Sequence, residues 1–394
     1  MENNIYENQA NAPKIVEQIM SMAIQEGASD IHFGPKEDYL WLRLRIDGKL
    51  VEKDRIPKSI EPAIISRLKI LSKMDIAEKR IPQDGRFRVK VMGRNIDFRV
   101  SSFPTVKGEK IVIRLLDESQ MKIDLTDLGF EPGMLGKWNE VIYRPNGMVL
   151  VTGPTGSGKT STLYSSLNAI KDVEKNIVTL EDPVEYQLEG IDQGQINPKA
   201  GFSFAAGLRS ILRQDPDIIM VGEMRDLETV NIAIQGALTG HLVFSTLHTN
   251  NAPATITRLM DMGVEPFLIS ASVIGVLAQR LIRKVCDRCK EEYFVSSDYL
   301  EKFGIQVNTK EVPFYRGRGC EYCNFKGTRG RAGIFELMLV NDLIRDLIIK
   351  RASEADIRNA LRKSGMVQLL QDGIKKALSG IVTLEEVLSS ASIA

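Results

Sequence analysis

The sequence predicts an α/β protein in which a parallel sheet carries a phosphate-binding loop. A smaller α+β domain precedes this sheet, and a cysteine-rich insertion and a helical region follow it. Three observations support this fold class: residues 153–160 match G-x-x-x-x-G-K-[ST], apolar runs such as 148–151 and 218–221 alternate with helical segments, and all four cysteines form two C-x-x-C pairs. At 394 residues the chain is long for one core, so we expect two or three domains.

The first domain is expected over residues 12–116, after a disordered polar tail at 1–11. Apolar residues at helical spacing predict a helix over 12–26. An alternating run over 39–46, followed by Asp47-Gly48, predicts a strand and a hairpin turn. The other predicted elements are a helix over 61–74 and strands over 87–91, 96–100 and 111–116, with a turn at Gly93 and a polar linker over 117–129.

The second domain, over 130–283, alternates predicted strands and helices, which indicates a parallel sheet covered on both faces. Its predicted strands lie at 148–151, 176–180, 218–221 and 242–245. A cysteine-rich subdomain is expected over 284–333. Helical periodicity, clearest from Asn341 onward, predicts a helical subdomain over 334–394.

The composition is typical of a soluble globular protein, with 43% hydrophobic and 26% charged residues. Its 52 basic and 51 acidic residues leave a net charge of +1, which argues against tight, nonspecific nucleic-acid binding as the main role. The polar start lacks the pattern of an export signal, and the most apolar stretch, 267–278, is too short to span a bilayer. We therefore expect a cytoplasmic protein that reaches a membrane only through partners.

The phosphate-binding loop follows an apolar strand and precedes a helix that begins at Ser161, which is the context that this motif requires. Its glycines let backbone N–H groups surround a phosphate, and the positive end of the helix adds to the attraction. Lys159 can reach the β- and γ-phosphates, and the Thr160 hydroxyl suits Mg²⁺. The loop therefore predicts a nucleoside triphosphate site made of Gly153, Pro154, Thr155, Gly156, Ser157, Gly158, Lys159, Thr160 and Ser161.

Three other predicted strands end in polar residues, at the edge where a parallel sheet binds its ligands. Glu181, Asp182 and Glu185 follow one strand, and Glu223 follows another. Glu223 is the candidate for activating water, whereas Glu181 or Glu185 is the candidate for holding Mg²⁺ through water. The alternative is that these acids are solvated strand-end residues or helix caps. We favour the functional interpretation because all three strands end in this way.

Two of the three histidines, His241 and His248, flank the predicted strand 242–245. Their spacing places them at opposite ends of the strand, so they need not act together. We favour a γ-phosphate sensor role for His248 and a structural or relay role for His241.

The pairs Cys286-x-x-Cys289 and Cys320-x-x-Cys323 predict a zinc site. Two such pairs can present four thiolates to one tetrahedral ion, and four protein ligands leave no open position for catalysis. The long spacing between the pairs requires an inserted hairpin or helix. Two redox motifs, or four inert thiols, are the alternatives.

Four segments resemble motifs of the secretion ATPase superfamily, in particular the branch that drives type IV pilus assembly and type II secretion (the general secretion pathway E type). These segments are GPTGSGKT, TLEDPVEY, DPDIIMVGEMRD and LTGHLVFSTLHTNNAP, and the earlier ASDIH and RIPQDGR also match. The resemblance implies a RecA-like core with a PAS-like N-terminal domain. It also implies that Glu223 is the catalytic glutamate and that Arg99 and Arg114 reach the nucleotide phosphates. His241 and His248 fall in the family's histidine box, and Glu181, Asp182 and Glu185 in its acidic box.

The resemblance further implies a homohexameric ATPase that uses ATP, Mg²⁺ and Zn²⁺ to drive an inner-membrane platform protein, and through it pilin subunits, from the inner face of the cytoplasmic membrane. We expect either a natural short form without the further N-terminal domain usual in assembly ATPases, or a truncated product. An ATPase of the same kind that serves type II secretion or a competence pilus remains an alternative. The other rivals are a hexameric nucleic-acid translocase, a noncatalytic nucleotide-gated scaffold and a small-molecule kinase. Direct nucleic-acid binding is not expected.

Overall fold

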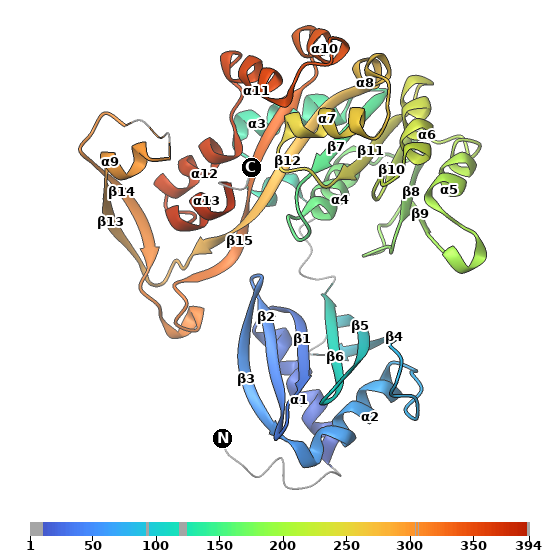
Figure 1. Cartoon of the computed structure of the whole chain (residues 1–394), viewed down its shortest axis with the longest axis vertical. Coiled ribbons are helices and arrows are strands. Elements are labelled where there is room, and N and C mark those ends of the chain that lie inside the picture. The colour runs from blue at the N-terminus through green and yellow to red at the C-terminus, as the bar shows by residue number, and fades with distance from the viewer. Residues whose placement is uncertain (1–10, 92–93, 118–123, 304, 306, 392–394) are drawn as a thin grey trace. The chain divides into compact units, whose positions relative to one another are not determined.

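The computed structural model describes residues 11–91, 94–117, 124–303, 305 and 307–391, and divides the chain into two compact units, Met1–Met121 and Lys122–Ala394 (Figure 1). The expectations for the tail at 1–10, for the turn at Gly93 and for residues 118–123 of the linker lie outside the described residues. The predicted domain boundaries stay predictions. One exception is described below: residues 334–339, predicted to begin the helical subdomain, belong to a strand.

The described residues of the first unit form a six-stranded antiparallel sheet with the strand order β3-β2-β1-β6-β5-β4. Helices α1 (Ala12–Gln25) and α2 (Glu61–Leu71) pack against each other and bury their apolar faces together with alternate strand residues such as Leu40, Leu42 and Leu44. The strands are β1 (Ala28–Pro35), β2 (Tyr39–Ile46), β3 (Lys49–Pro57), β4 (Gln83–Val91), β5 (Arg94–Thr105) and β6 (Gly108–Asp117).

The predicted hairpin after residue 46 is confirmed, because β2 pairs with β3 across Asp47 and Gly48, which have φ values of 49° and 83°. Positive φ at both central residues defines the tight turn that suits twisted strands, and Gly48 adopts it without the steric cost of a side chain. The sequence did not predict β3 itself, because this strand is mostly exposed and lacks an apolar alternation.

The described residues of the second unit form a seven-stranded sheet with the order β15-β12-β7-β11-β10-β8-β9, parallel except for the antiparallel edge strand β15. Every residue of β7 and β11 is buried, so both faces at the centre of the sheet are covered, as predicted. The strands are β7 (Gly147–Thr152), β8 (Ile177–Glu181), β9 (Asp192–Gln195), β10 (Ile218–Val221), β11 (Leu242–Leu247), β12 (Val273–Val285) and β15 (Thr328–Leu339).

Helices cover this sheet and follow it to the C-terminal end of the described chain (Figure 1). They are α3 (Pro132–Ile142), α4 (Lys159–Ile170), α5 (Phe204–Ile211), α6 (Leu227–Leu238), α7 (Ala252–Asp261), α8 (Pro266–Ser272), α10 (Asp342–Ile349), α11 (Glu354–Lys363), α12 (Leu369–Leu378) and α13 (Leu384–Ala391). The helical region begins at Asn341, whose side chain caps α10. Residues 334–339, expected in the helical subdomain, instead belong to β15.

The cysteine-rich segment is inserted between β12 and β15, which pair along most of their length. Within the insertion, β13 (Lys290–Ser296) and β14 (Glu311–Gly317) form an antiparallel pair flanking α9 (Ser297–Glu301). The sequence did not predict β12, because its apolar first half continues the apolar helix α8 without a polar break.

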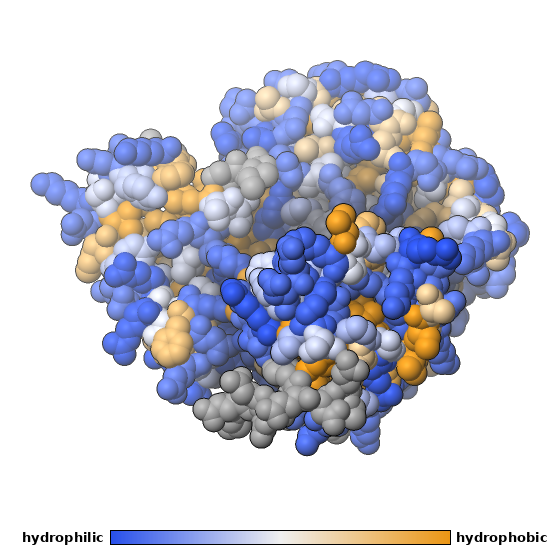
Figure 2. Space-filling view, turned by 60° about the horizontal axis from the view of Figure 1, so that its bottom comes forward, coloured by the Kyte–Doolittle hydropathy of each residue, from blue (hydrophilic) through white to orange (hydrophobic). Residues whose placement is uncertain are grey.

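The face in Figure 2 is largely hydrophilic, with hydrophobic residues in small separate patches. The large hydrophobic side chains that are exposed belong to many different elements. Among the described residues, no helix has the length and apolar character needed to cross a membrane.

Candidate functional site

The phosphate-binding loop connects β7 to α4, as the motif predicts. Gly153, Gly156 and Gly158 have φ values of 148°, 80° and 90°. At Gly153 a Cβ atom would lie 2.5 Å from the backbone oxygen of Gln279, so the position requires glycine. Pro154, Thr155, Gly156 and Thr160 are exposed, which leaves this side of the loop open to a ligand.

The Lys159 ammonium group lies over the loop, where its Nζ donates to the backbone oxygens of Gly153 at 2.8 Å and Pro154 at 3.2 Å. Burial lowers the pKa of Lys159 to about 8, while Glu223 acts to raise it and Arg280 to lower it further. The loop therefore presents a partly desolvated cation beside its backbone amides, an arrangement that suits a polyphosphate.

The parallel register places the ends of β8, β10 and β11 next to the end of β7. Leu247 of β11 pairs with Thr152 of β7, and Val221 of β10 lies between Ser245 of β11 and Leu180 of β8. The Thr246 hydroxyl donates to the backbone oxygen of Gly222 at 2.7 Å, which secures the end of β10. The polar residues that follow these strands therefore share one edge of the sheet with the phosphate-binding loop, as predicted.

Glu223 lies between two basic groups at this edge. Its Oε1 is 2.6 Å from Nη2 of Arg225, and its Oε2 is 3.7 Å from Nε2 of His248. The Glu223 side chain is only 16% exposed, whereas that of His248 is 50% exposed. Burial lowers the pKa of His248, and Lys159 lowers it further although Glu223 opposes the shift, so the imidazole is mainly neutral at pH 7. A carboxylate and a neutral imidazole are thus held together beside Lys159, where they can orient or deprotonate a water molecule.

Glu181 is brought to the same edge but has both oxygens engaged. Its Oε2 accepts from the Tyr164 hydroxyl, and its Oε1 accepts from Thr179 Oγ1 at 2.6 Å and Gln193 Nε2 at 3.1 Å. Burial raises the pKa of Glu181, against these donors. In this arrangement Glu181 links α4 to β8 and β9. Of the three predicted acids, Asp182 is exposed and Glu185 half-buried, so these two are more accessible to hydrated Mg²⁺.

His241 is not brought to the phosphate-binding loop. It precedes β11 at the opposite edge of the sheet, roughly 23 Å along the strand from His248 at about 3.3 Å per residue. Its Nδ1 lies 2.8 Å from the backbone oxygen of Gly236 at the end of α6. Its position fits the structural role that we favoured, and it does not fit a contact with a nucleotide on this chain's own loop.

Arg99 and Arg114 belong to the first unit, where they occupy directly opposite positions on β5 and β6. Opposite residues of an antiparallel pair point to the same face of a sheet. Arg114 is exposed and forms an ion pair with Asp30, with Nε 3.2 Å from Oδ1. The two arginines therefore place two basic side chains next to each other on one face of this sheet. Their contact with nucleotide phosphates stays a prediction.

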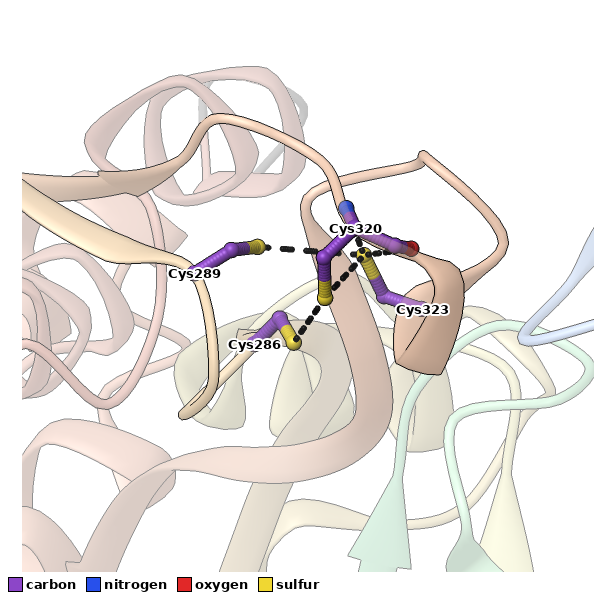
Figure 3. Close-up of side chains that lie close together, drawn as sticks. All are labelled: Cys286, Cys289, Cys320 and Cys323. Carbon is purple, nitrogen blue, oxygen red and sulfur yellow. Dashed lines mark hydrogen bonds between the residues drawn. The ribbon is translucent and has the colours of Figure 1, made fainter.

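The four cysteine sulfur atoms point toward one another in Figure 3 and all lie within 4.8 Å of one another. The pair distances are 3.9 Å for Cys286–Cys320, 3.8 Å for Cys289–Cys323 and 3.7 Å for Cys320–Cys323. Four sulfurs at the usual Zn–S distance of about 2.3 Å form a tetrahedron with edges of about 3.8 Å. The sulfur positions therefore fit a tetrahedral zinc ion.

The backbone around the cysteines also suits thiolate ligands. Burial by itself raises the pKa of Cys323, but the amides of Cys320 and Gly327, both 3.3 Å from its sulfur, and the thiols of Cys320 and Cys289 bring the pKa down to about 6. Burial raises the pKa of Cys289, so the low pKa of Cys323 depends on its neighbours. Cβ atoms at Gly317 and Gly327 would lie 2.0 Å and 2.2 Å from the other residue's backbone oxygen, so only glycine permits this close approach.

Two buried residues of β12 were missed by sequence reasoning. Gln279 Nε2 donates to the backbone oxygen of Ser157 in the loop at 2.8 Å. Arg280 Nη2 donates to the backbone oxygen of Asn250, two residues after His248, at 2.7 Å. A polar Gln-Arg pair within an otherwise apolar run is a signal that could have indicated them, since buried polar side chains require partners.

A family model described as "Type II/IV secretion system protein" matches residues 6–389. The chain belongs to the type II/IV secretion system protein family. This membership confirms the resemblance inferred from the sequence motifs. This secretion-family chain is accordingly an ATPase, and the loop, Glu223 and His248 form its candidate active site.

Two curated relatives are similar over nearly the whole of this secretion-family chain. Type II secretion system protein E of Dickeya dadantii is 47% identical over 382 residues, which cover 97% of this chain and 76% of that protein. Type IV pilus assembly ATPase PilB of Thermus thermophilus is 49% identical over 383 residues, which cover 97% of this chain and 43% of that protein.

Solved structures of similar fold agree with this assignment. The crystal structure of the pilus retraction motor PilT with bound ADP has a TM-score of 0.63 and 29% identity, and the match covers 95% of this chain and 96% of PilT. The ATPase DotB of Legionella pneumophila has a TM-score of 0.71 over 97% of this chain and 96% of DotB, but at 20% identity it supports the fold alone.

We expect ATP binding to weaken at alkaline pH because of Lys159. Its ammonium group carries the charge that attracts phosphates, and with a pKa of about 8 it loses that charge as the pH rises through this value. The Kd for ATP should therefore rise above about pH 8, by up to about tenfold per pH unit. Titration calorimetry between about pH 7 and pH 10 measures this change.

Lys159→Arg is the matched control, because a guanidinium group stays charged over this pH range. Whatever its affinity, this variant should lack the alkaline weakening. An ATP affinity of the natural protein that stays constant over the same range would contradict the role of Lys159.

Proposed function

We propose that this chain is the motor ATPase that powers extension of a type IV pilus or pseudopilus. The observation that carries the proposal is the gathering of the phosphate-binding loop, Glu223 and His248 at one sheet edge, in a chain that also bears four clustered cysteines. Its similarity to both PilB and type II secretion protein E supports such a machine. A type II secretion or competence-pilus ATPase is the second candidate, supported by the same relatives.

In the proposed reaction, backbone amides of residues 153–160 and the ammonium group of Lys159 bind the phosphates of ATP. Thr160 would hold Mg²⁺, with Asp182 or Glu185 holding its water ligands, and the ion would neutralise phosphate charge. Glu223 accepts a proton from the attacking water. Its carboxylate is in position to do so, because it lies beside the neutral imidazole of His248 and near Lys159, the residue proposed to bind the phosphates. His248 senses the γ-phosphate through its exposed ring.

Mechanical coupling is proposed to come from Arg99 and Arg114. The two guanidinium groups occupy opposite positions on β5 and β6. Charge-assisted hydrogen bonds from them to the phosphates would make the placement of the first unit depend on the nucleotide that is bound. We propose that six copies form a ring in the cytoplasm that drives an inner-membrane platform protein, and through it pilin subunits, without binding nucleic acid.

The four cysteines are proposed to hold a structural zinc ion. Their sulfurs lie at tetrahedral spacing, and four protein ligands leave no position for substrate. The ion would join the turn that follows β12 to the turn that precedes β15, and so stabilise the base of the insertion.

Deletion of the gene in its host, followed by complementation, tests the proposed function. We expect loss of surface pili, restored by the natural chain and not by Lys159→Ala, which should fail to bind ATP. Normal pili together with loss of secreted proteins would contradict pilus extension and favour type II secretion. Stimulation of the purified ATPase by DNA would instead favour a nucleic-acid translocase.

A further inference from the structure

Two buried polar residues of β12, Gln279 and Arg280, lie between the phosphate-binding loop and the segment 248–251 that follows β11. Their exposed fractions are 2% and 6%. Placing an amide and a guanidinium group inside a protein costs free energy unless each finds partners. The partners of both side chains therefore indicate what these residues are for.

Gln279 holds the phosphate-binding loop in place through both its side chain and its backbone. Its Nε2 donates to the backbone oxygen of Ser157 at 2.8 Å, and its Oε1 accepts from the hydroxyl of Thr162 in α4 at 2.8 Å. Its own backbone approaches Gly153 so closely that a Cβ there would lie 2.5 Å from the Gln279 oxygen. One residue thus contacts the start of the loop, its middle and the helix that follows it.

Arg280 secures the segment that follows His248. Its Nη2 donates to the backbone oxygen of Asn250 at 2.7 Å, while its Nη1 donates to the backbone oxygen of Gln279 at 3.0 Å. The guanidinium group therefore joins the strand that supports the loop to the segment that carries the histidine. Its positive charge also experiences the field of the buried Glu336 carboxylate, which accepts from the amide of Ala252 at 2.9 Å.

One side of this segment faces open space. His248 and Asn250 line an open cavity of about 390 Å³, which Glu354 and Arg358 of α11 also line. Polar contacts hold the other sides of the segment: Arg280 donates to Asn250, Glu336 accepts from the Ala252 amide, and the Thr249 hydroxyl lies 2.6 Å from that of Thr152. Two further contacts join Thr249 to Thr255 at 2.7 Å and Asn251 to Glu354 of α11 at 3.0 Å.

We propose that Gln279 and Arg280 are positioning residues for ATP hydrolysis. Gln279 sets the shape of the phosphate-binding loop and thereby the affinity for nucleotide. Arg280 sets the distance between His248 and the loop, so that His248 and Glu223 face the γ-phosphate bound there. This inference rests on the roles proposed above for Glu223 and His248. A displacement of about 1 Å in such an arrangement can reduce a rate by about 100-fold.

The test uses substitutions that separate charge from shape. Arg280→Lys keeps the charge but lacks the planar guanidinium group, whose Nη1 and Nη2 donate to the backbone oxygens of Gln279 and Asn250, and Arg280→Met keeps the apolar stem without the charge. Gln279→Leu removes both side-chain hydrogen bonds at similar volume. Arg283→Met is the matched control, because Arg283 lies on the same strand but forms an ion pair with Glu386 of α13.

For each purified variant, kcat and KM for ATP, the Kd for ADP and the melting temperature are measured. We expect Arg280→Met to lower kcat by about 100-fold and Arg280→Lys by about tenfold, with the Kd for ADP changed by less than about threefold. Gln279→Leu should raise the Kd for ADP by about tenfold or more. The control should keep kcat and Kd within about twofold, whatever its melting temperature.

A purely structural role predicts a different result, in which melting temperatures fall while kcat per folded molecule does not change. If Arg280→Lys is folded and has the kcat of the Arg283→Met control, the inference is wrong, and this comparison stands even if Arg280→Met fails to fold. Failure of the proposed chemistry is distinguishable, because Glu223→Gln would then retain turnover regardless of what the Arg280 variants do.

Discussion

Glu223→Gln is expected to lower ATP turnover by about 1,000-fold while the Kd for ATP changes by less than about threefold. Glutamine has nearly the same shape and can keep a contact with Arg225, which lies 2.6 Å from the carboxylate in the natural chain. It cannot accept a proton from water, because an amide is not a base near neutral pH. The substitution therefore removes the proposed chemical step and leaves the binding site in place.

Single-turnover hydrolysis and nucleotide binding, measured on the same preparation, separate these two effects. Glu228→Gln is a suitable control: this acid lies in the first turn of α6, is 60% exposed and forms an ion pair with Arg209. It should keep normal turnover. Near-normal hydrolysis by Glu223→Gln would remove Glu223 from its proposed role and leave Asp182 or Glu185 to be tested next.

Loss of the proposed zinc ion should have the largest effect on stability. Cys286→Ser is expected to reduce bound zinc from about one ion per chain to nearly none, because three thiolates no longer complete the tetrahedron. Binding of structural zinc contributes on the order of 10 kcal/mol in small domains, so the insertion between β12 and β15 should lose its order. Metal analysis, together with thermal melting before and after chelation, measures both effects.

Zinc added back after chelation should restore the melting temperature of the natural chain and not that of Cys286→Ser. This difference serves as the internal control, since the chain contains no cysteine outside the two pairs. Purified natural protein that holds no zinc, and in which mass spectrometry finds two disulfides after alkylation, would instead support the redox alternative.

Much of the core could be predicted because its signals are local. Buried parallel strands require continuous apolar runs, so β7, β10 and β11 were located to within two residues. The loop between β7 and α4 was recognisable because glycine, lysine and threonine are each required at a defined position for phosphate binding. The hairpin turn at Asp47-Gly48 was likewise recognisable, since few residue pairs tolerate positive φ at both positions.

Long-range pairing was harder to predict. Strand β12 pairs with β15 across an insertion of more than forty residues, the 286–327 segment, and nothing near either strand specifies the other. Strand β3 gave no periodic signal because it lies at a sheet edge with most side chains exposed. Ser157, Thr162 and Asn250, the partners of Gln279 and Arg280 outside β12, lie more than 25 residues away in sequence, so the roles of these two residues became visible only from contacts.

By itself, the sequence determined that this chain binds ATP, belongs to a secretion ATPase family and carries paired cysteines, because motifs record requirements at neighbouring positions. Only the tertiary structure decided which polar residues meet. Strand register brought Glu223 to His248, and hydrogen bonds from Tyr164, Thr179 and Gln193 occupied both oxygens of Glu181. These outcomes depend on how distant strands pair. The pairing is the one that minimises the free energy of the whole core, and a local sequence pattern contains no information about that free energy.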